Sequence, residues 1–512
     1  MKEKLLVLDF GSQYTFLIAR RLREQGFYTE IASYALPLEK IRKEKFHGII
    51  LSGSPASLTN QGSPTLSQSI FELGIPILGI CYGMQLMTKL FGGEVCRGEK
   101  KEYGKAFIKL HGTHKLFDGL NPHSSCVWMS HGDRIESLPQ GFKVLASSDN
   151  SPYAAMAHES KPFYALQFHP EVVHTEKGSK ILAHFAEKIC GVTERWSMGN
   201  FIEEALIKIC SQVGESGNVL SALSGGVDST VCTKLLGKAL GNRVKAVFVD
   251  TGLLRLHETQ EVLQYLKSEG IEIHVVDARE RFLTALKGVT DPEQKRKVIG
   301  KKFIEVFEEE ARNFNKIQFL AQGTLYPDVI ESVSDKGPSS TIKSHHNVGG
   351  LPEKMNLKLI EPLRELFKDE VRDLGLKLGL PKHIVGRHPF PGPGLGIRIL
   401  GEVTQERVAI VQKADAIYIE EIRKAGLYDD IWQAMAILLP VQSVGVMGDE
   451  RTYENVLALR AVTSLDGMTA DWYRCPSDVL EKMSNRIINE VRGINRVVYD
   501  ISSKPPATIE WE

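Results

Sequence analysis

The stretch ILGICYGMQ places Cys81 between Gly79 and Gly83, where an apolar run ends and a helical pattern begins. This arrangement is typical of a nucleophile elbow, a sharp strand-to-helix turn that requires small neighbours and exposes the nucleophile above a sheet. The helix that follows directs its partial positive charge at the sulfur, which favours the thiolate. A cysteine in an apolar run is otherwise more often a buried core residue, so the flanking glycines carry the catalytic interpretation.

A base for this thiol is available in ALQFHPE, a predicted strand that ends at His169 and Glu171. A cysteine nucleophile needs a base, and the base needs a group that orients its ring. His169 and Glu171 can fill these two roles, although an isolated histidine would more often be a hydrogen-bonded surface residue. The segment LSGSP (51–55) is a second strand-to-glycine turn, whose backbone amides could form an oxyanion hole with the amide of Tyr82.

In this order and spacing, these pieces resemble the class I (triad-type) glutamine amidotransferase domain, and the resemblance covers residues 1–191. It implies that Cys81 is the nucleophile, His169 the base and Glu171 the residue that orients the base. The implied reaction releases ammonia from glutamine through a glutamyl thioester. The residues implied for the oxyanion and for glutamine binding are Gly53, Tyr82, Gln85, Ser130 and His131.

A second chemical motif lies in NVLSALSGGVDST (218–230), where a predicted strand meets a predicted helix. Gly225 and Gly226 allow the backbone to approach phosphate oxygens, and the helix N-terminus adds amides and its dipole. The lysine that the common phosphate loop places before its Ser/Thr is absent. Asp228 is unusual in such a loop, because a carboxylate repels phosphate unless it caps the helix or binds a metal. A glycine turn with a capping aspartate is the alternative.

The full SGGVDS string resembles the pyrophosphate loop of the N-type ATP pyrophosphatases. That family grips the β and γ phosphates as a leaving group while the α phosphorus is attacked, so the resemblance implies adenylylation of a substrate oxygen with Mg²⁺ present. Asp228 and Asp328 are the implied metal ligands, although Asp328, in AQGTLYPD, could equally be a helix cap. The implied ATP-binding residues are Ser224, Gly225, Gly226, Val227, Asp228, Ser229 and Thr230.

The elements that must position these residues form two arrays of short apolar runs alternating with helical patterns, followed by a mixed region. We therefore predict an α/β protein with two successive doubly wound, mostly parallel domains and a smaller α+β C-terminal domain. The predicted boundaries are 1–191, 192–386 and 387–512. The stretch 331–350 is predicted to be either a disordered loop or a lid over ATP, and PFPGPG within 387–396 reads as a stiff linker.

Over the whole chain, the order of these units and the ending SKPPATIEWE resemble the glutamine-hydrolysing GMP synthetases. The resemblance implies that ammonia displaces AMP from adenylated xanthosine monophosphate (XMP), giving GMP. It also implies a homodimer formed through the C-terminal domain and Mg²⁺ with ATP, with no tightly bound organic cofactor. The implied XMP-binding residues are Arg296, Gln433, Asp449, Arg451, Lys504, Ile509 and Glu510.

Composition narrows the function classes. The 63 basic and 63 acidic residues balance, so no net field favours nucleic acid or an acidic membrane. No apolar run approaches the roughly 18 residues of a membrane span, and seven scattered cysteines indicate reduced thiols in the cytoplasm. The neutral charge argues against a tRNA-modifying enzyme, and the intact motifs argue against a scaffold with dead sites. Glutamine-dependent NAD synthetase shares the second array but has a nitrilase-like glutaminase.

Overall fold

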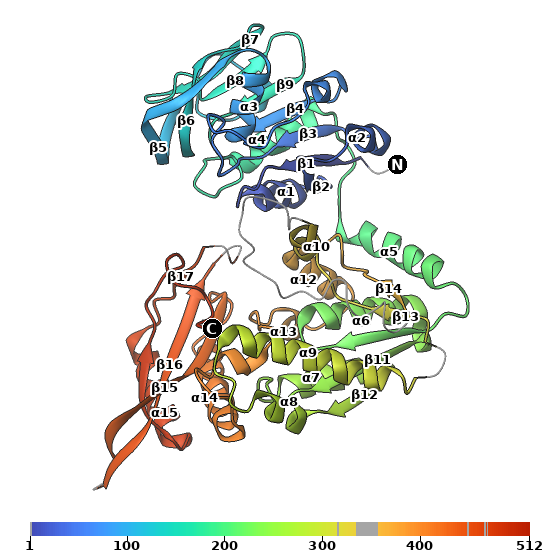
Figure 1. Cartoon of the computed structure of the whole chain (residues 1–512), viewed down its shortest axis with the longest axis vertical. Helices are drawn as coiled ribbons and strands as arrows, with labels where there is room; N and C mark the ends of the chain where they lie inside the picture. The colour runs from blue at the N-terminus through green and yellow to red at the C-terminus, as the bar shows by residue number, and fades with distance from the viewer. Residues whose placement is uncertain (1–2, 315–316, 334–356, 448–449, 465–466, 468) are drawn as a thin grey trace. The chain divides into compact units, whose positions relative to one another are not determined.

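The computed structural model describes residues 3–314, 317–333, 357–447, 450–464, 467 and 469–512 (Figure 1). The described chain divides into two compact units, one with residues 3–201 and 327–333, the other with the remaining described residues. The predicted boundary at residue 191 lies close to a unit boundary, whereas the boundary at residue 386 falls inside the second unit. Most of the stretch 331–350 lies outside the described residues.

The first unit is built on one nine-stranded sheet. Five of its strands are parallel, and three of these, Leu5–Asp9, Gly48–Leu51 and Ile77–Ile80, are short, mostly apolar runs, as expected for strands buried on both faces. Four further strands continue the sheet in antiparallel pairing. In spatial order the strands are β2 (Thr29–Ser33), β1 (Leu5–Asp9), β3 (Gly48–Leu51), β4 (Ile77–Ile80), β9 (Phe163–Leu166), β8 (Ala155–His158), β7 (Phe142–Ser148), β5 (Glu94–Leu110) and β6 (Ser125–Ser137).

Helices cover the parallel half of this sheet, which confirms the α/β class. Met84 and Leu86 of one helix pack in a core cluster with Leu6 and Leu8 of β1, and β1 is also buried on its other face. The helices of this unit are α1 (Thr15–Glu24), α2 (Leu38–Glu44), α3 (Tyr82–Leu90) and α4 (Gly178–His184). Because α3 directly follows the central strand β4, its first residues lie at the carboxyl edge of the sheet, where ligands bind in such folds.

The second unit begins with a five-stranded sheet that is entirely parallel. In spatial order its strands are β12 (Glu272–Asp277), β11 (Val244–Asp250), β10 (Val219–Leu223), β13 (Phe319–Ala321) and β14 (Lys358–Ile360). The helices of this unit that follow or connect them are α6 (Val227–Leu240), α7 (Glu258–Ser268), α8 (Arg279–Leu286), α9 (Pro292–Ala311), α12 (Lys368–Lys377) and α13 (Lys382–Val385). Two helices are divided between the units: α5 (Met198–Val213) begins in the first unit and continues into the second, and α10 (Tyr326–Val333) lies in the first unit except for its first residue. The alternation of strands and helices predicted from the sequence is confirmed.

The last part of the chain forms a third, mixed sheet with two helices against it, which confirms its α+β character. A long antiparallel hairpin dominates the sheet, and a short strand and a parallel strand pair with its second arm. The elements are α14 (Gln405–Lys424), β15 (Gln433–Met447), β16 (Glu450–Thr463), β17 (Asp471–Trp472), α15 (Ser477–Glu490) and β18 (Ile494–Tyr499).

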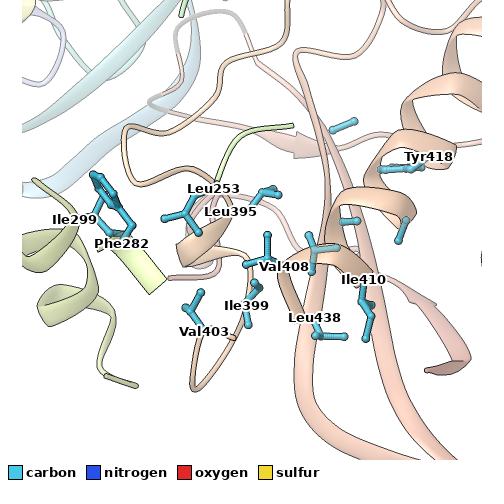
Figure 2. Close-up of a cluster of buried hydrophobic side chains, with 14 of the residues drawn as sticks. Leu253, Phe282, Ile299, Leu395, Ile399, Val403, Val408, Ile410, Tyr418 and Leu438 are labelled. Carbon is cyan, nitrogen blue, oxygen red and sulfur yellow. The ribbon is translucent and has the colours of Figure 1, made fainter. Parts of the chain in front are cut away.

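One hydrophobic core joins the second and third sheets. Leu253 and Phe282 from the first of these parts pack in the same buried cluster as Ile399 and Leu438 from the second (Figure 2). The segment PFPGPG is therefore no free linker: it leads into a buried 3-10 turn, where the Leu395 amide donates to the Leu253 carbonyl over 2.7 Å. The phosphate-loop sheet and the C-terminal sheet are thereby packed into one body.

Candidate active sites

The backbone of Cys81 is strained in the way a nucleophile elbow requires. Its φ of 52° and ψ of −104° lie in a region that residues other than glycine rarely adopt. Two main-chain hydrogen bonds hold this conformation: the Cys81 amide donates to the Leu166 carbonyl (2.7 Å) and the Gln85 amide donates to the Cys81 carbonyl (3.1 Å). The turn between β4 and α3 therefore fixes the sulfur at the end of the strand.

Two glycines make the turn possible because the strand and the helix nearly touch. A Cβ on Gly79 would lie 2.7 Å from the carbonyl carbon and oxygen of Gly83, and a Cβ on Gly83 would overlap the Leu51 carbonyl of β3. These neighbours are backbone atoms of packed elements, so they cannot turn aside. The sequence-based reading of the two glycines is consistent with this geometry.

His169 and Glu171 lie together in the interior of the first unit. The His169 Nδ1–H donates to Glu171 Oε1 over 2.6 Å, and both side chains are almost fully buried. Burial alone would lower the pKa of His169, but the Glu171 carboxylate and the Cys81 side chain outweigh it and raise that pKa well above its usual value. His169 lies three residues beyond the end of β9, so it belongs to the loop after the strand rather than to the strand itself.

The thiol, the imidazole and the carboxylate thus form a connected set. The Cys81 side chain is close enough to His169 to raise the pKa of that imidazole, and its Sγ lies 3.6 Å from the Ser130 carbonyl oxygen. The raised pKa of His169 favours its protonated form, in which the ring nitrogen donates to the Glu171 carboxylate. Thr175 fixes the main chain at His169, because its hydroxyl donates to the His169 main-chain carbonyl over 2.6 Å.

The other predicted glutaminase residues surround this set. A Cβ on Gly53 would lie 3.4 Å from His169 Cε1, so the LSGSP turn borders the triad. The side-chain amide of Gln85 donates through Nε2 to the main-chain carbonyl of Asp133 over 3.0 Å, and His131 Nδ1 donates to the same oxygen over 2.9 Å. These buried side chains hold β6 against α3 beside the nucleophile. Tyr82, which follows Cys81, has its hydroxyl bonded to a loop carbonyl, and burial raises its pKa to about 12.

The glycine-rich loop of the second unit lies where the sequence predicts it, between β10 and α6. Gly225 has a φ of 81°, which explains why a glycine is needed there. The Ser229 and Thr230 hydroxyls donate to the Gly226 carbonyl over 3.1 and 2.7 Å, and Ser229 Oγ also lies 3.1 Å from Ser224 Oγ. The hydroxyls thus shape the loop around the first turn of α6, a 14-residue helix.

Asp228 lies in the first turn of α6 beside a lysine that sequence reasoning missed. Lys368, the first residue of α12, places Nζ 2.5 Å from Asp228 Oδ2. The other carboxylate oxygen, Oδ1, is buried and has no hydrogen-bond partner. A loop without its own lysine therefore has one nearby that is supplied by a distant helix, and its carboxylate keeps one oxygen for a cation.

A second cation near the loop also escaped the sequence analysis. Arg387 Nη1 donates to the Gly225 carbonyl over 3.4 Å, and its Nη2 lies 3.6 Å from Glu261. The neighbouring His388 accepts a hydrogen bond from the Ala434 amide of β15 over 3.2 Å. Burial lowers the pKa of His388 to about 4, so this ring is a neutral structural element. The sequence feature that could have pointed to Arg387 and His388 is RHPFPGPG, the stretch that begins with these two residues and lies, along the chain, between the glycine-rich loop and the third sheet.

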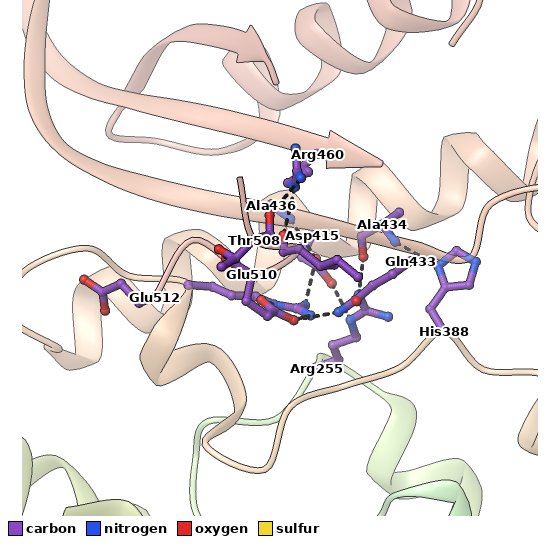
Figure 3. A network of polar contacts seen from close by, with 12 residues as sticks. Arg255, His388, Asp415, Gln433, Ala434, Ala436, Arg460, Thr508, Glu510 and Glu512 are labelled. Carbon is purple, nitrogen blue, oxygen red and sulfur yellow. Dashed lines mark hydrogen bonds and ion pairs between the residues drawn. The ribbon is translucent and has the colours of Figure 1, made fainter. Parts of the chain in front are cut away.

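Part of the predicted XMP set gathers around the end of the chain (Figure 3). Gln433 Nε2 donates to Glu510 Oε1 over 2.6 Å, and the buried Arg398 donates to both Glu510 oxygens over 3.0 and 3.2 Å. Arg296 donates to the Glu512 carbonyl. The remaining members of the tail group are also placed: Ile509 is buried against the third sheet, and Lys504 donates to the Gly467 carbonyl.

Arg451 does not join this group within one chain. It pairs with Val446 near the exposed end of the β15–β16 hairpin, whereas Gln433 pairs with Val462 at the other end. The eleven residues from 451 to 462 correspond to about 35 Å of strand. Asp449 lies outside the described residues. Asp328 lies in the first turn of α10, which suits the capping alternative as well as the metal role.

The described residues contain neither a helix that could span a membrane nor a cluster of metal-binding side chains. Within the ranges given above, no helix is long and apolar enough to cross a membrane. In the same ranges, no cluster of three or more His, Cys, Asp or Glu side chains could hold a metal ion by itself. All seven cysteines are free thiols.

Comparison with known proteins gives full-length relatives. The family model described as glutamine amidotransferase class-I matches residues 6–189, and the model described as GMP synthase C terminal domain matches residues 420–511. Two proteins named GMP synthase [glutamine-hydrolyzing] are similar over the whole chain. The Nitratiruptor sp. protein is 62% identical over 99% of each chain, and the Aquifex aeolicus protein is 57% identical over 100% of each chain.

Proposed function

The chain belongs to the family of glutamine-hydrolysing GMP synthases, and we propose how its own residues divide the reaction. The protein makes GMP from XMP: glutamine, ATP and water are consumed, and glutamate, AMP and diphosphate are released. The division rests above all on one observation, the strained Cys81 turn beside a buried, hydrogen-bonded His169–Glu171 pair.

Cys81 attacks the side-chain amide carbon of glutamine and forms a glutamyl thioester. His169 holds the thiol proton and passes it to the leaving nitrogen, which departs as ammonia, and then helps water to attack the thioester. Glu171 keeps the ring oriented and stabilises its charged form. We assign the oxyanion to the amides of Gly53 and Tyr82, because the first borders His169 and the second follows the nucleophile.

The glycine loop of the second unit binds the β and γ phosphates of ATP while an oxygen of XMP attacks the α phosphorus. The loop amides at the start of α6 and the hydroxyls of Ser224, Ser229 and Thr230 face the diphosphate. Lys368 supplies the positive charge that the loop sequence lacks, since it pairs with Asp228 at the mouth of the loop. Diphosphate leaves, and the adenylated carbon of the xanthine becomes open to ammonia, which displaces AMP.

The residues present fit a magnesium ion at this loop. Asp228 Oδ1 is a buried carboxylate oxygen without a partner, and carboxylate and phosphate oxygens are the ligands that Mg²⁺ prefers. Asp228 would hold the ion, and the bound ion would neutralise charge on the diphosphate. Asp328 remains the second predicted ligand.

For XMP we propose a site at the end of the chain. Arg296 and Lys504 supply positive charge for the 5′-phosphate, whereas Gln433 and Glu510 supply the hydrogen-bonding groups that a purine and a ribose need. The contact between Gln433 and Glu510 supports a common site. Ile509 provides an apolar surface for the base. Asp449 and Arg451 remain predicted members of the set, although within one chain Arg451 lies at the opposite end of the hairpin from Gln433.

We further propose a homodimer through the third sheet. The distal end of the β15–β16 hairpin exposes apolar side chains without cover: Val446 is 77% exposed, Tyr453 64% and Val444 45%. Val444 pairs with Tyr453, so they lie on one face, which a second copy can cover. Small-molecule substrates and a cytoplasmic location complete the proposal; the seven free thiols support the latter.

A labelling experiment tests the division of labour. With ATP, Mg²⁺, XMP and amide-¹⁵N glutamine, the label should appear in the exocyclic amine of GMP. Cys81→Ser should abolish synthesis from glutamine but retain synthesis from ammonium, because the second unit does not use the thiol. Loss of both activities in a folded Cys81→Ser protein would contradict separate sites. Asp228→Asn should abolish both, because neither route avoids adenylylation.

A further inference from the structure

The last residues of the chain are bound by three basic side chains that are all completely buried. Arg460 donates to the main-chain carbonyls of Thr508 and Ile509 over 2.9 and 2.8 Å. Arg398 holds Glu510 by two hydrogen bonds, as described above. Lys295 of α9 places Nζ 2.5 Å from Glu512 Oε2. Each of these three cations is 0% exposed, so the tail is fixed at successive residues.

Lys295 depends on the tail more than the two arginines do. Arg398 and Arg460 also pair with Asp415 and Asp500, whereas the carboxylate within ion-pair distance of Lys295 is that of Glu512. Lys295 Nζ also donates to a neutral group, the Ile399 carbonyl, over 2.6 Å. A fully buried ammonium without a counter-charge is costly, so the Lys295 site is complete only when Glu512 is docked.

Arg296, the next residue of α9, also binds the docked Glu512. Arg296 is half-buried, and one of its terminal nitrogens donates to the main-chain carbonyl of Glu512. The side chain and the carbonyl of the same tail residue are thus bound by two consecutive residues of one helix. A guanidinium has five N–H donors, and a single bond to Glu512 orients it while most donors remain for an anion.

We propose that Lys295 is a positioning residue for the nucleotide phosphate: by pairing with Glu512 it sets the carbonyl that orients Arg296 toward a nucleoside 5′-monophosphate. The inference rests on the proposed XMP site, because Arg296 is its phosphate ligand there. It adds two residues, Lys295 and Glu512, neither of which touches the nucleotide. Their effect reaches the substrate through the orientation of the guanidinium.

The test compares steady-state constants in the ammonium-dependent reaction, which bypasses the glutaminase. Lys295→Met and Glu512→Gln should each raise KM for XMP about tenfold, the effect of one charge-assisted contact, with KM for ATP within about twofold of the wild-type value. Lys297→Met is the matched control, because Lys297 lies on the same helix in an exposed pair with Glu293. It should leave both constants unchanged.

The following outcomes would contradict the positioning role or the XMP site on which it rests. If KM for XMP in Glu512→Gln equals that in Lys297→Met, or if KM for ATP rises as much as KM for XMP, the positioning role is wrong. Glu512→Gln keeps the side-chain shape, so it remains informative if Lys295→Met does not fold. Arg296→Ala separates this inference from the proposed XMP site. A raised KM for XMP in Arg296→Ala but not in Glu512→Gln overturns only the inference, whereas no change in Arg296→Ala overturns the site and the inference with it.

Discussion

The elbow makes a quantitative prediction for Gly79→Ala. An alanine Cβ would lie 2.7 Å from the Gly83 carbonyl carbon and oxygen and 2.8 Å from the Met84 nitrogen, whereas ordinary contacts begin at 3.4 Å. The difference, 3.4 − 2.7 = 0.7 Å, is the smallest shift that separates β4 from the first turn of α3. Cys81 lies between these two elements, so the sulfur moves with them. A misplacement of about 1 Å can cost about 100-fold in rate, and overpacking costs about 1–3 kcal/mol of stability.

We therefore expect the glutaminase rate of Gly79→Ala to fall by one to two orders of magnitude, to about 1–10% of wild type, while synthesis from ammonium is retained. The assay is glutamate release in the presence of ATP and XMP, alongside GMP formation from ammonium. Gly199→Ala is the matched control, because a Cβ there meets nothing closer than 3.8 Å in the same unit. Equal glutaminase rates for the two variants would refute the argument that backbone contact sets the nucleophile.

Further predictions concern the charges and the exposed face. Glu171→Gln should slow glutaminase about 10²–10⁴-fold. Because Glu171 raises the pKa of His169, the stabilisation that this pair gives the folded protein is fully present below about pH 6.5 and is lost as pH rises through the folded-state pKa of His169. The melting temperature of Glu171→Gln should therefore fall short of the wild-type value by less at high pH than at low pH. A deficit that grows with pH would contradict the pairing. Lys368→Met should lower ATP-dependent diphosphate release about tenfold or more even with ammonium as donor; unchanged release would separate this lysine from the phosphate site. Val446→Asp should shift the sedimentation coefficient from dimer toward monomer, and an unaltered dimer would locate the interface elsewhere.

The triad and the loop could be predicted from sequence because their chemistry is local. Gly79 and Gly83 each lie two residues from Cys81, and Glu171 lies two residues from His169. The two groups are far apart in the sequence, but each follows a parallel strand of the same sheet, and the carboxyl ends of such strands lie at one edge. The Gly225 turn follows the same logic. Alternating apolar runs also predicted the α/β class, since parallel strands are buried on both faces.

What the sequence could not supply were contacts between distant residues. Lys368 meets Asp228 across 140 positions, and Lys295 meets Glu512 across 217. Neither lysine carries a local signal, because a lone lysine is usually a solvated surface charge. Composition alone favours a linker for PFPGPG, because proline and glycine disfavour regular elements, whereas the resemblance to GMP synthetases implies otherwise. In the structure the turn that follows it is buried by packing with Leu253, which local composition does not encode.

The pairing of Lys368 with Asp228 explains why this loop can do without the usual lysine. A lysine inside the loop would be fixed beside the terminal phosphate, where it suits transfer of that phosphate. In the proposed reaction the attacked atom is the α phosphorus and the diphosphate must leave. The positive charge at the loop therefore has to stabilise a departing group. A carboxylate in the first turn of α6 would repel phosphate if it stood alone, but Lys368 neutralises one oxygen and the other can face a cation. In the proposed magnesium site, charge balance at the loop would be divided between a helix far along the chain and the metal ion. Lys368→Met should therefore make ATP use depend more steeply on Mg²⁺ concentration than the wild-type reaction does.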